Sequence, residues 1–529
     1  MYRAALGING TVFGDVDYRV DATAMHTDLR REQNGYVYIA NLLTSIAQGT
    51  FNFVNPQLTP QSVRDFVSPD NVSDASSDLY AVQASLSKSL FEMPGGPLQV
   101  GIGGSIRYEA VDAPSANPDT NGPTQRFFTL NAFGTTGSRE VYSAFAEVNA
   151  PVLDQLEINA SGRYDRYSSG QDNFSPKIGA IFTPIRQIAV RGTYSRGFRI
   201  PAFGESNALP TTGFVNVGIN TLPQSFLSQY GANCNAGNAS GCPTYITSYA
   251  RGLTTLASPD LEPEKSRSFT GGVRFAPVSN VAFTVDYFNI KKTGAIASAP
   301  IQPALDAYFA GQPIPAGYNV IADAPSTEFP NALPRPAFVE SALVNANTIK
   351  AEGIDFAGNA RFEFGNVRIL ASAEASYILE LSTTFQDGSK QEYQGTLGNY
   401  ALTAGTGTPE WTGNAQLTVE VEPFSLTANV RYFDGYNLSA EDETGPGTAG
   451  QGGLAVDYLP EDVESYTTLD LTGTAKVNDS FTFYISVLNV QDDLPPIDPA
   501  TYGAHLYNAV QGGSGIFGRQ FRAGVRVGF

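Results

Sequence analysis

Two cysteines lie close together in a segment rich in glycine, asparagine and serine, Cys234-Asn-Ala-Gly-Asn-Ala-Ser-Gly-Cys242. In an oxidising compartment two such neighbours form a disulfide, so we expect a bridge that closes a small loop. Metal binding is the weaker interpretation. The chain's two histidines, His26 and His505, lie far from both cysteines in the sequence, and two thiolates make an incomplete ligand set.

The sequence contains little that could support catalysis. Neither histidine accompanies a nucleophile motif, so a Ser-His hydrolase is not indicated. The carboxylates of Asp492 and Asp493 suit a solvated turn better than an acid/base pair. Glu441-Asp-Glu443 lies in a glycine-rich segment without the spacing of calcium ligands. We therefore expect no enzymatic activity, no metal and no cofactor.

The composition limits the class of protein. Charged residues make up 16% of the 529 residues, below the roughly 25% of ordinary soluble domains. The net charge of -19 argues against nucleic acid as a partner, because nucleic-acid binders need a positive surface. No run of about 18 apolar residues occurs, which excludes a transmembrane helix but not β-strands that cross a membrane.

Apolar and polar residues alternate strictly in about seventeen segments along the whole chain, which predicts strands with one apolar and one polar face. In one example, Leu156, Ile158 and Ala160 alternate with polar neighbours. Near the C-terminal end the pattern assigns Leu417, Val419, Leu426 and Val430 to lipid. The same pattern assigns Gln416, Glu420, Asn429 and Arg431 to the lumen.

Tight turns and long connections alternate between these segments. The tight turns are Phe13-Gly-Asp15, Pro94-Gly-Gly96, Pro151-Val-Leu-Asp154, Pro184-Ile-Arg186, Pro277-Val-Ser-Asn280, Phe364-Gly-Asn366, Glu422-Pro423 and Val477-Asn-Asp479. The other connections are expected at 28–78, 110–138, 196–264, 297–346, 382–408, 437–464 and 491–516, with a short one near 168–173. This asymmetry is typical of an outer-membrane barrel with short periplasmic turns and long extracellular loops. The sequence thus predicts an all-β, transmembrane antiparallel β-barrel in the cell outer membrane, forming one domain over 1–529.

The final segment, Phe521-Arg-Ala-Gly-Val-Arg-Val-Gly-Phe529, alternates in the same way. Its two arginines must face the lumen, because an arginine on the lipid face is costly. A last strand that ends on an aromatic residue resembles the terminal signal read by the outer-membrane assembly machinery. We expect Phe529 to act as this signal.

Several local motifs resemble those of TonB-dependent receptors. They are Tyr194-Ser-Arg-Gly-Phe-Arg-Ile-Pro201, Pro259-Asp-Leu-Glu-Pro-Glu-Lys265, Val281-Ala-Phe-Thr-Val-Asp-Tyr-Phe-Asn-Ile290, Asn489-Val-Gln-Asp-Asp-Leu-Pro-Pro496, and the ending from Gly518 to Phe529. Their order and spacing carry more weight than any one of them. The resemblance is clear over about 170–295 and 480–529.

The resemblance implies a barrel of about 22 strands with a plugged lumen, of which this chain would supply the last seventeen. The plug, the TonB box and a signal peptide are not recognised in the sequence. We expect the natural gene to continue upstream of Met1, and we expect contact with the TonB complex only through that region.

As a function, the resemblance implies TonB-energised uptake of a scarce or bulky nutrient of the siderophore, cobalamin, oligosaccharide or peptide class. A passive porin or channel is the alternative, and an extracellular adhesion protein explains the turn and loop asymmetry less well. Outer-membrane lipid would be a further partner. The residues expected to contact substrate, in or beside the longest loop, are Arg196, Arg199, Tyr230, Tyr245, Tyr249 and Arg251.

Overall fold

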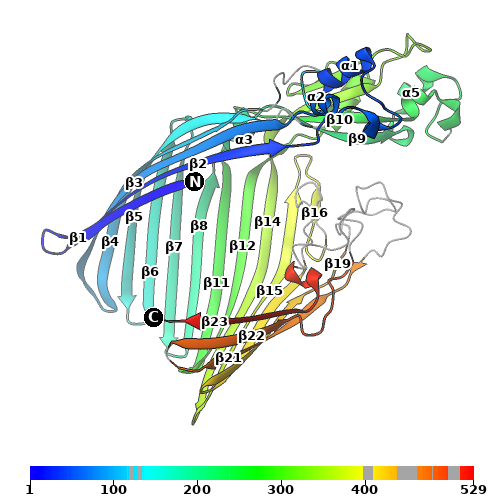
Figure 1. Ribbon diagram of the computed structural model, residues 1–529. Helices are drawn as coiled ribbons and strands as arrows, with labels where there is room; N and C mark the ends of the chain where they lie inside the picture. The colour runs from blue at the N-terminus through cyan, green and yellow to red at the C-terminus, as the bar shows by residue number, and fades with distance from the viewer. Residues whose placement is uncertain are drawn as a thin grey trace.

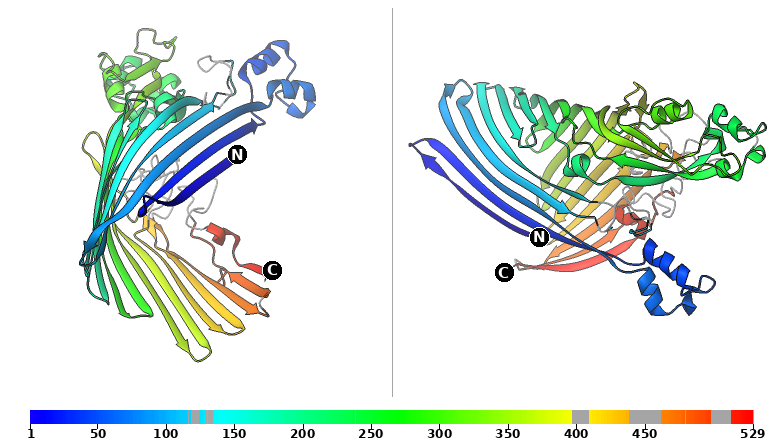
Figure 2. Two further views of the ribbon diagram at one scale, coloured as in Figure 1. Left: turned by 90° about the vertical axis from the view of Figure 1, so that its left-hand side faces the viewer. Right: turned by 90° about the horizontal axis from the view of Figure 1, so that it is seen from above.

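One large antiparallel sheet that curves as an open trough forms the body of the protein (Figure 1; Figure 2). The computed structural model describes every residue except 116, 118–123, 129, 131–133, 238, 397–408, 438–461, 479, 498–512 and 529. Three residues considered in the sequence analysis lie outside the described residues. They are His505 and Glu441, for which no catalytic or metal-binding role is expected, and Phe529, the expected assembly signal. Within the described residues, no helix is long and apolar enough to cross a membrane.

The main sheet has 21 strands in the described part of the chain, and four of them lie within connections. The other seventeen follow one another in chain order, each antiparallel to the next, which confirms the predicted all-β fold and strand number. These strands are β1 (Tyr2–Val12), β2 (Val16–Gln33), β3 (Asn71–Met93), β4 (Gly96–Ala113), β5 (Thr135–Leu153), β6 (Leu156–Tyr167), β7 (Asp172–Ile185), β8 (Ile188–Arg199), β11 (Glu264–Val278), β12 (Val281–Ser298), β14 (Pro336–Phe364), β15 (Val367–Thr384), β17 (Trp411–Val421), β18 (Phe424–Phe433), β21 (Tyr466–Lys476), β22 (Phe481–Leu488) and β23 (Gln520–Val527).

The tight turns gather at one end of the sheet and the long connections at the other (Figure 1). Each predicted tight turn is at a junction between two of the seventeen strands, although several strands extend into the predicted turn residues. Gly14 and Gly365 have φ of 90° and 61° in two of these turns, a conformation that glycine adopts at little cost. The long connections also lie where the alternation predicts them, although β2 and β3 extend further into the first one than expected.

The long connections contain helices and short strands that the alternation pattern does not predict. The helices are α1 (Ile39–Gln48), η1 (Pro56–Leu58), α2 (Gln61–Val67), α3 (Phe203–Asn207), η2 (Ile219–Thr221), α4 (Gln224–Leu227), η3 (Ser228–Tyr230), η4 (Ala239–Gly241), α5 (Thr244–Thr247), α6 (Gln302–Phe309) and η6 (Gly513–Phe517). The added strands are β9 (Thr211–Gly218), β10 (Ser248–Leu256), β13 (Tyr318–Ala322), β16 (Lys390–Glu392), β19 (Tyr436–Asn437) and β20 (Asp462–Val463).

The register separates two faces of the sheet. Leu417 lies opposite Ala428, and Val419 opposite Leu426, whereas Gln416 lies opposite Asn429. Directly opposed residues point to the same face, so the apolar and polar sets separate as predicted. We call the apolar face, which carries many exposed large side chains, the outer face, and the polar face the inner face.

Aromatic side chains form a band on the outer face toward the long connections. Tyr80 stacks on Tyr108 with ring centroids 6.2 Å apart, and Tyr377 stacks on Trp411 at 4.5 Å. Further members of the band are Tyr142, Tyr164, Phe174, Tyr194, Phe269 and Tyr287. Such a girdle marks the level of a membrane interface in outer-membrane barrels.

The sheet is not closed. Among the described residues, β1 pairs only with β2, and β23 only with β22. Strand direction alternates along the sheet, so the first and the last of seventeen strands run in the same direction. Both run toward the end of the sheet that carries the tight turns. The two chain ends therefore border the open side of the trough (Figure 2).

The separation of faces predicts unequal effects of the same substitution. Val419→Arg should lower the free energy of unfolding in lipid by roughly 2–4 kcal/mol, whereas Gln416→Arg on the inner face should cost little. The measurement is a denaturant titration of the protein refolded in lipid vesicles. Equal losses for the two variants would contradict the assignment of faces.

Candidate functional site

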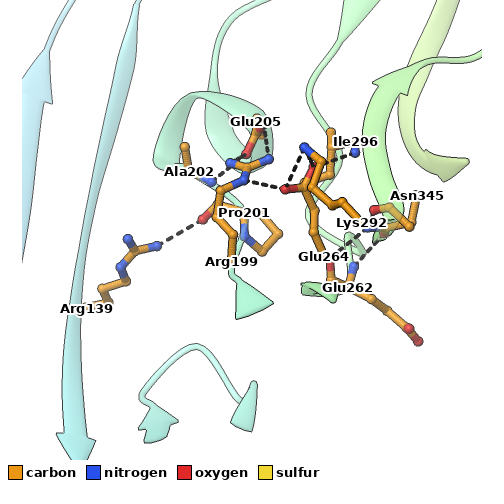
Figure 3. A network of polar contacts seen from close by, with 11 residues as sticks. Arg139, Arg199, Pro201, Ala202, Glu205, Glu262, Glu264, Lys292, Ile296 and Asn345 are labelled. Atoms are coloured by element: carbon orange, nitrogen blue, oxygen red, sulfur yellow. Dashed lines mark hydrogen bonds and ion pairs between the residues drawn. The ribbon is translucent and has the colours of Figure 1, made fainter. Parts of the chain in front are cut away.

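The longest connection, 200–263, leaves the sheet at β8 and returns at β11, and a group of charged side chains joins its two ends (Figure 3). Glu264 is at the start of β11 and only 2% exposed. Its carboxylate accepts hydrogen bonds from Arg199 Nε at 2.6 Å and from the Ile296 backbone N–H at 2.9 Å. Lys292 Nζ lies 3.3 Å away. One buried carboxylate thus links β8, β11 and β12 at the rim of the sheet.

Arg199 also holds the first turn of the connection. Its two terminal nitrogens donate to Glu205 of α3 at 2.8 and 2.9 Å, and Glu205 accepts the Ala202 backbone N–H at 2.6 Å. From β5, Arg139 donates to the Pro201 carbonyl at 3.0 Å and lies 4.5 Å from the Phe203 ring centroid. The chain is therefore fixed on leaving β8.

The returning end is fixed as well. Asn345 of β14 accepts the Glu262 backbone N–H and donates to the Glu262 carbonyl, both at 2.8 Å (Figure 3). We call the charged and polar groups around Arg199 and Glu264 the root network. It gives the long connection a defined base, so the segment above it can fold as a unit.

That unit combines two connections, 200–263 and 299–335, and we call it the rim module. Its sheet has the order β9-β10-β14-β13, in which β10 runs parallel to the upper end of β14. Its apolar core contains Val217, Leu222, Phe226, Leu227, Tyr230, Ile246, Tyr249 and Ala332. A second group, including Ala304, Leu305 and Val339, packs α6 against the same sheet. The module lies beyond the sheet at its long-connection end (Figure 1).

Tyrosine hydroxyls join the two connections of the rim module. Tyr230 donates to the Leu333 carbonyl at 2.6 Å, Tyr245 to the Ala324 carbonyl at 2.7 Å, and Tyr308 to the Pro334 carbonyl at 2.8 Å. Burial raises the pKa of Tyr308 to about 12 and raises that of Tyr230 as well, so both remain neutral donors at physiological pH.

An arginine and a disulfide complete the module. Arg335 lies between the rings of Tyr245 and Tyr249, 4.3 and 4.9 Å from their centroids, and pairs with Asp323 at 2.8 Å. Burial raises the pKa of Tyr249, and the charges of Arg251 and Arg335 partly offset this effect. A disulfide joins Cys234 to Cys242, and Cys234 is buried in the module's core.

The residues of the rim module that are expected to contact substrate differ in how deeply they are buried. Tyr230 and Tyr249 are 1% and 7% exposed and belong to the core, so contact with a ligand would require the module to open. Tyr245 packs against that core. Arg251 is half-buried on β10. The three tyrosines therefore contribute to the packing of the module.

The two arginines of the Tyr194 to Pro201 motif point to opposite faces of β8. Arg199 is on the inner face and is engaged by Glu205 and Glu264 in the root network. Arg196 lies directly opposite Arg267 on the outer face, where its Nε donates to Tyr194 Oη at 3.0 Å. The two arginines expected to contact substrate therefore have different surroundings, and their contact with a substrate stays a prediction.

Polar side chains of the inner face line a hollow of about 780 Å³ on β14, β15, β17 and β18. It includes Asp355, Glu374, Asn414 and Arg431, and Ser376 donates to Asp355 at 2.6 Å. The alternation already assigns Gln416, Asn429 and Arg431 to the lumen. The grouping of these residues with Asp355 and Glu374 depends on the register and could not be inferred from one strand.

Residues 2–490 match the family described as TonB dependent receptor-like, beta-barrel. The chain belongs to this family. The receptors of this family are outer-membrane transporters and not enzymes, and this receptor barrel is accordingly a protein of the cell outer membrane. Comparison with curated proteins finds no sequence match.

Solved structures share the fold of this receptor barrel. The siderophore receptor PirA from Acinetobacter baumannii matches with a TM-score of 0.62 and 14% identity, covering 100% of this chain and 62% of that one. A mutant of the ferric enterobactin receptor PfeA from Pseudomonas aeruginosa, in complex with enterobactin, matches with a TM-score of 0.60, 14% identity and coverage of 100% and 62%. The ferric-catecholate import receptor Fiu from Escherichia coli K12 matches with a TM-score of 0.55 and 13% identity, covering 100% of this chain and 64% of that one. The chain thus spans less than two thirds of the length of these proteins.

The root network predicts a local effect of losing one carboxylate. Glu264→Gln leaves Arg199 and Lys292 without their buried counter-charge. Because both cations are partly solvated, we expect the module's base to lose about 1–2 kcal/mol. Limited proteolysis within 200–263 measures this loss. Glu205→Gln, whose side chain is more exposed, is the matched control and should have a smaller effect. Protection equal to the wild type in Glu264→Gln would show that the network does not hold the connection.

The disulfide predicts that the unreduced, denatured protein has no reactive thiol. A thiol reagent should label two cysteines per chain only after reduction, because the chain contains two cysteines in all. Two labelled thiols before reduction would contradict the bridge.

Proposed function

We propose that this chain is the barrel portion of an outer-membrane receptor that imports a ferric siderophore with energy from the TonB complex. Its membership of the receptor family is the observation that carries the proposal. The rim module adds support, because a folded element at the extracellular end is positioned to meet a ligand. Loops longer than about 15 residues in a compact protein are usually functional.

The siderophore class is proposed from the structural relatives. Three of them are described as a siderophore receptor, a ferric enterobactin receptor and a ferric-catecholate import receptor. Their low sequence identity supports a shared fold and leaves the ligand of this chain to experiment. Cobalamin, oligosaccharides and peptides are therefore the alternative ligands to be tested beside siderophores.

The inner-face hollow offers chemistry suited to a polar ligand on its way through the lumen. Arg431 and Glu374 lie on the same transverse row of the sheet, with Asn414 between them. Their charged and amide groups line the hollow with donors and acceptors. Such groups can exchange hydrogen bonds with a moving polar solute, whereas an apolar wall would not.

Uptake by cells tests the proposal. Cells that carry the gene should accumulate radioactive iron from at least one siderophore, and deletion of the gene or of TonB should abolish this accumulation. The same cells are tested with labelled cobalamin, oligosaccharides and peptides. TonB-dependent uptake of one of those instead would replace the siderophore class. Uptake of many small solutes without TonB would overturn the receptor proposal and favour a passive channel.

A further inference from the structure

Four cations gather on the outer face of β8, β11 and β12, just beyond the aromatic band. Arg196 lies directly opposite Arg267, and Arg267 lies directly opposite Lys291. Lys265 is on the same face of β11, one step closer to the long connections. We call Arg196, Lys265, Arg267 and Lys291 the basic patch. It arises from three neighbouring strands (Figure 1).

The height of the basic patch on the sheet is set by its neighbours on the same strands. Tyr194 and Phe269, which lie opposite each other, are two residues closer to the middle of the sheet than Arg196 and Arg267. Below them the outer face continues with apolar side chains, all 42–50% exposed, namely Val190, Val273, Phe275, Phe283 and Val285. The patch is therefore above hydrocarbon and aromatic girdle, at the level of lipid headgroups.

No ion pair neutralises the four cations among the described residues. On the inner face of the same strands, three of the four cations are paired, since Arg191 pairs with Asp286 at 2.5 Å and both Arg199 and Lys292 pair with Glu264. The contrast does not arise from a shortage of carboxylates, because the chain has 51 Asp and Glu against 32 Lys and Arg. Like charges directly opposite each other on a sheet are destabilising. An anion from outside the chain would remove that cost.

At the edge of the basic patch, a neighbouring lysine is neutralised by carboxylates of the protein itself. Lys350 of β14 lies directly opposite Lys291 and continues the row. Its Nζ contacts Glu352 at 2.7 Å and Glu380 at 2.5 Å. The row thus ends at a neutralised lysine, and the unpaired charge is confined to β8, β11 and β12.

We propose that the basic patch binds the phosphate of an anionic lipid headgroup in the leaflet on the side of the long connections. Arginine donates to phosphate oxygens in a planar fork, and lysine contributes a point charge. The acyl chains would lie along the exposed valine and phenylalanine side chains below. Charge complementarity at headgroup height selects the lipid over a soluble ligand, because the apolar strip directly below the cations is in the bilayer.

Lipid titration of the purified protein in a non-ionic detergent, read by native mass spectrometry, tests the basic patch. Phosphatidylglycerol should bind more tightly than phosphatidylcholine, whose headgroup has the same phosphate but no net charge. Each cation near a membrane surface contributes about fivefold, so the triple variant Arg196→Gln, Arg267→Gln, Lys291→Gln should bind phosphatidylglycerol roughly 100-fold more weakly. Added salt should weaken wild-type binding.

The matched control removes three positive charges from the inner face of the same sheet, at Lys177, Arg274 and Arg431, which also lack an ion pair among the described residues. This variant should bind phosphatidylglycerol as the wild type does. The charge-conserving pair Arg196→Lys, Arg267→Lys should retain most of the binding even if the triple glutamine variant fails to fold. Equal losses in the inner and outer triple variants would overturn the proposal. So would competition by inorganic phosphate at a concentration equal to that of the lipid.

Discussion

Backbone hydrogen bonding in a medium without water is the constraint on which this structure depends. An unpaired N–H or C=O in hydrocarbon costs several kcal/mol, so a membrane strand needs a partner on both sides. Among the described residues, the strands of the ladder from β2 to β22 meet this condition, whereas β1 and β23 are paired on one side. The ladder runs from β1 to β23 without an interruption in the described residues. Irregular backbone is therefore confined to the two ends of the sheet. Functional side chains can lie only on the strand faces or in the connections at the rim.

The same ladder decides which side chains meet on the inner face. Arg191 of β8 and Asp286 of β12 are separated by β11, yet their side chains form a bidentate pair. Gly272 lies opposite both residues. A Cβ at this position would be 1.9 Å from Asp286 Oδ1. The ion pair on the inner face thus depends on a glycine, which has no side chain, in the strand between its two partners.

The strands and turns could be predicted from the sequence because each depends on local chemistry. Alternation with a period of two reports which residues face lipid, and residues such as Gly14 and Gly365 mark the turns. The rim module could not be predicted in this way. The hydroxyl of Tyr230 meets the carbonyl of Leu333 across 103 residues. Neither partner carries a local signal of that contact. Aromatic and arginine residues in a long loop suit a ligand site and a small apolar core equally well.

Near the rim of the sheet, the alternation of apolar and polar residues no longer predicts to which face a side chain points. A register shift between Glu352 and Gly353 puts Tyr377 and Glu380 of β15, an odd and an even residue, on the same outer face. A strict period of two would have placed Glu380 in the lumen. Arg196 and Arg199 are the converse case. Three residues apart in one motif, they point to opposite faces of β8, so one meets a buried carboxylate and the other meets the membrane surface. A motif therefore identifies a segment of the barrel rim, but the register determines what each of its charges can bind.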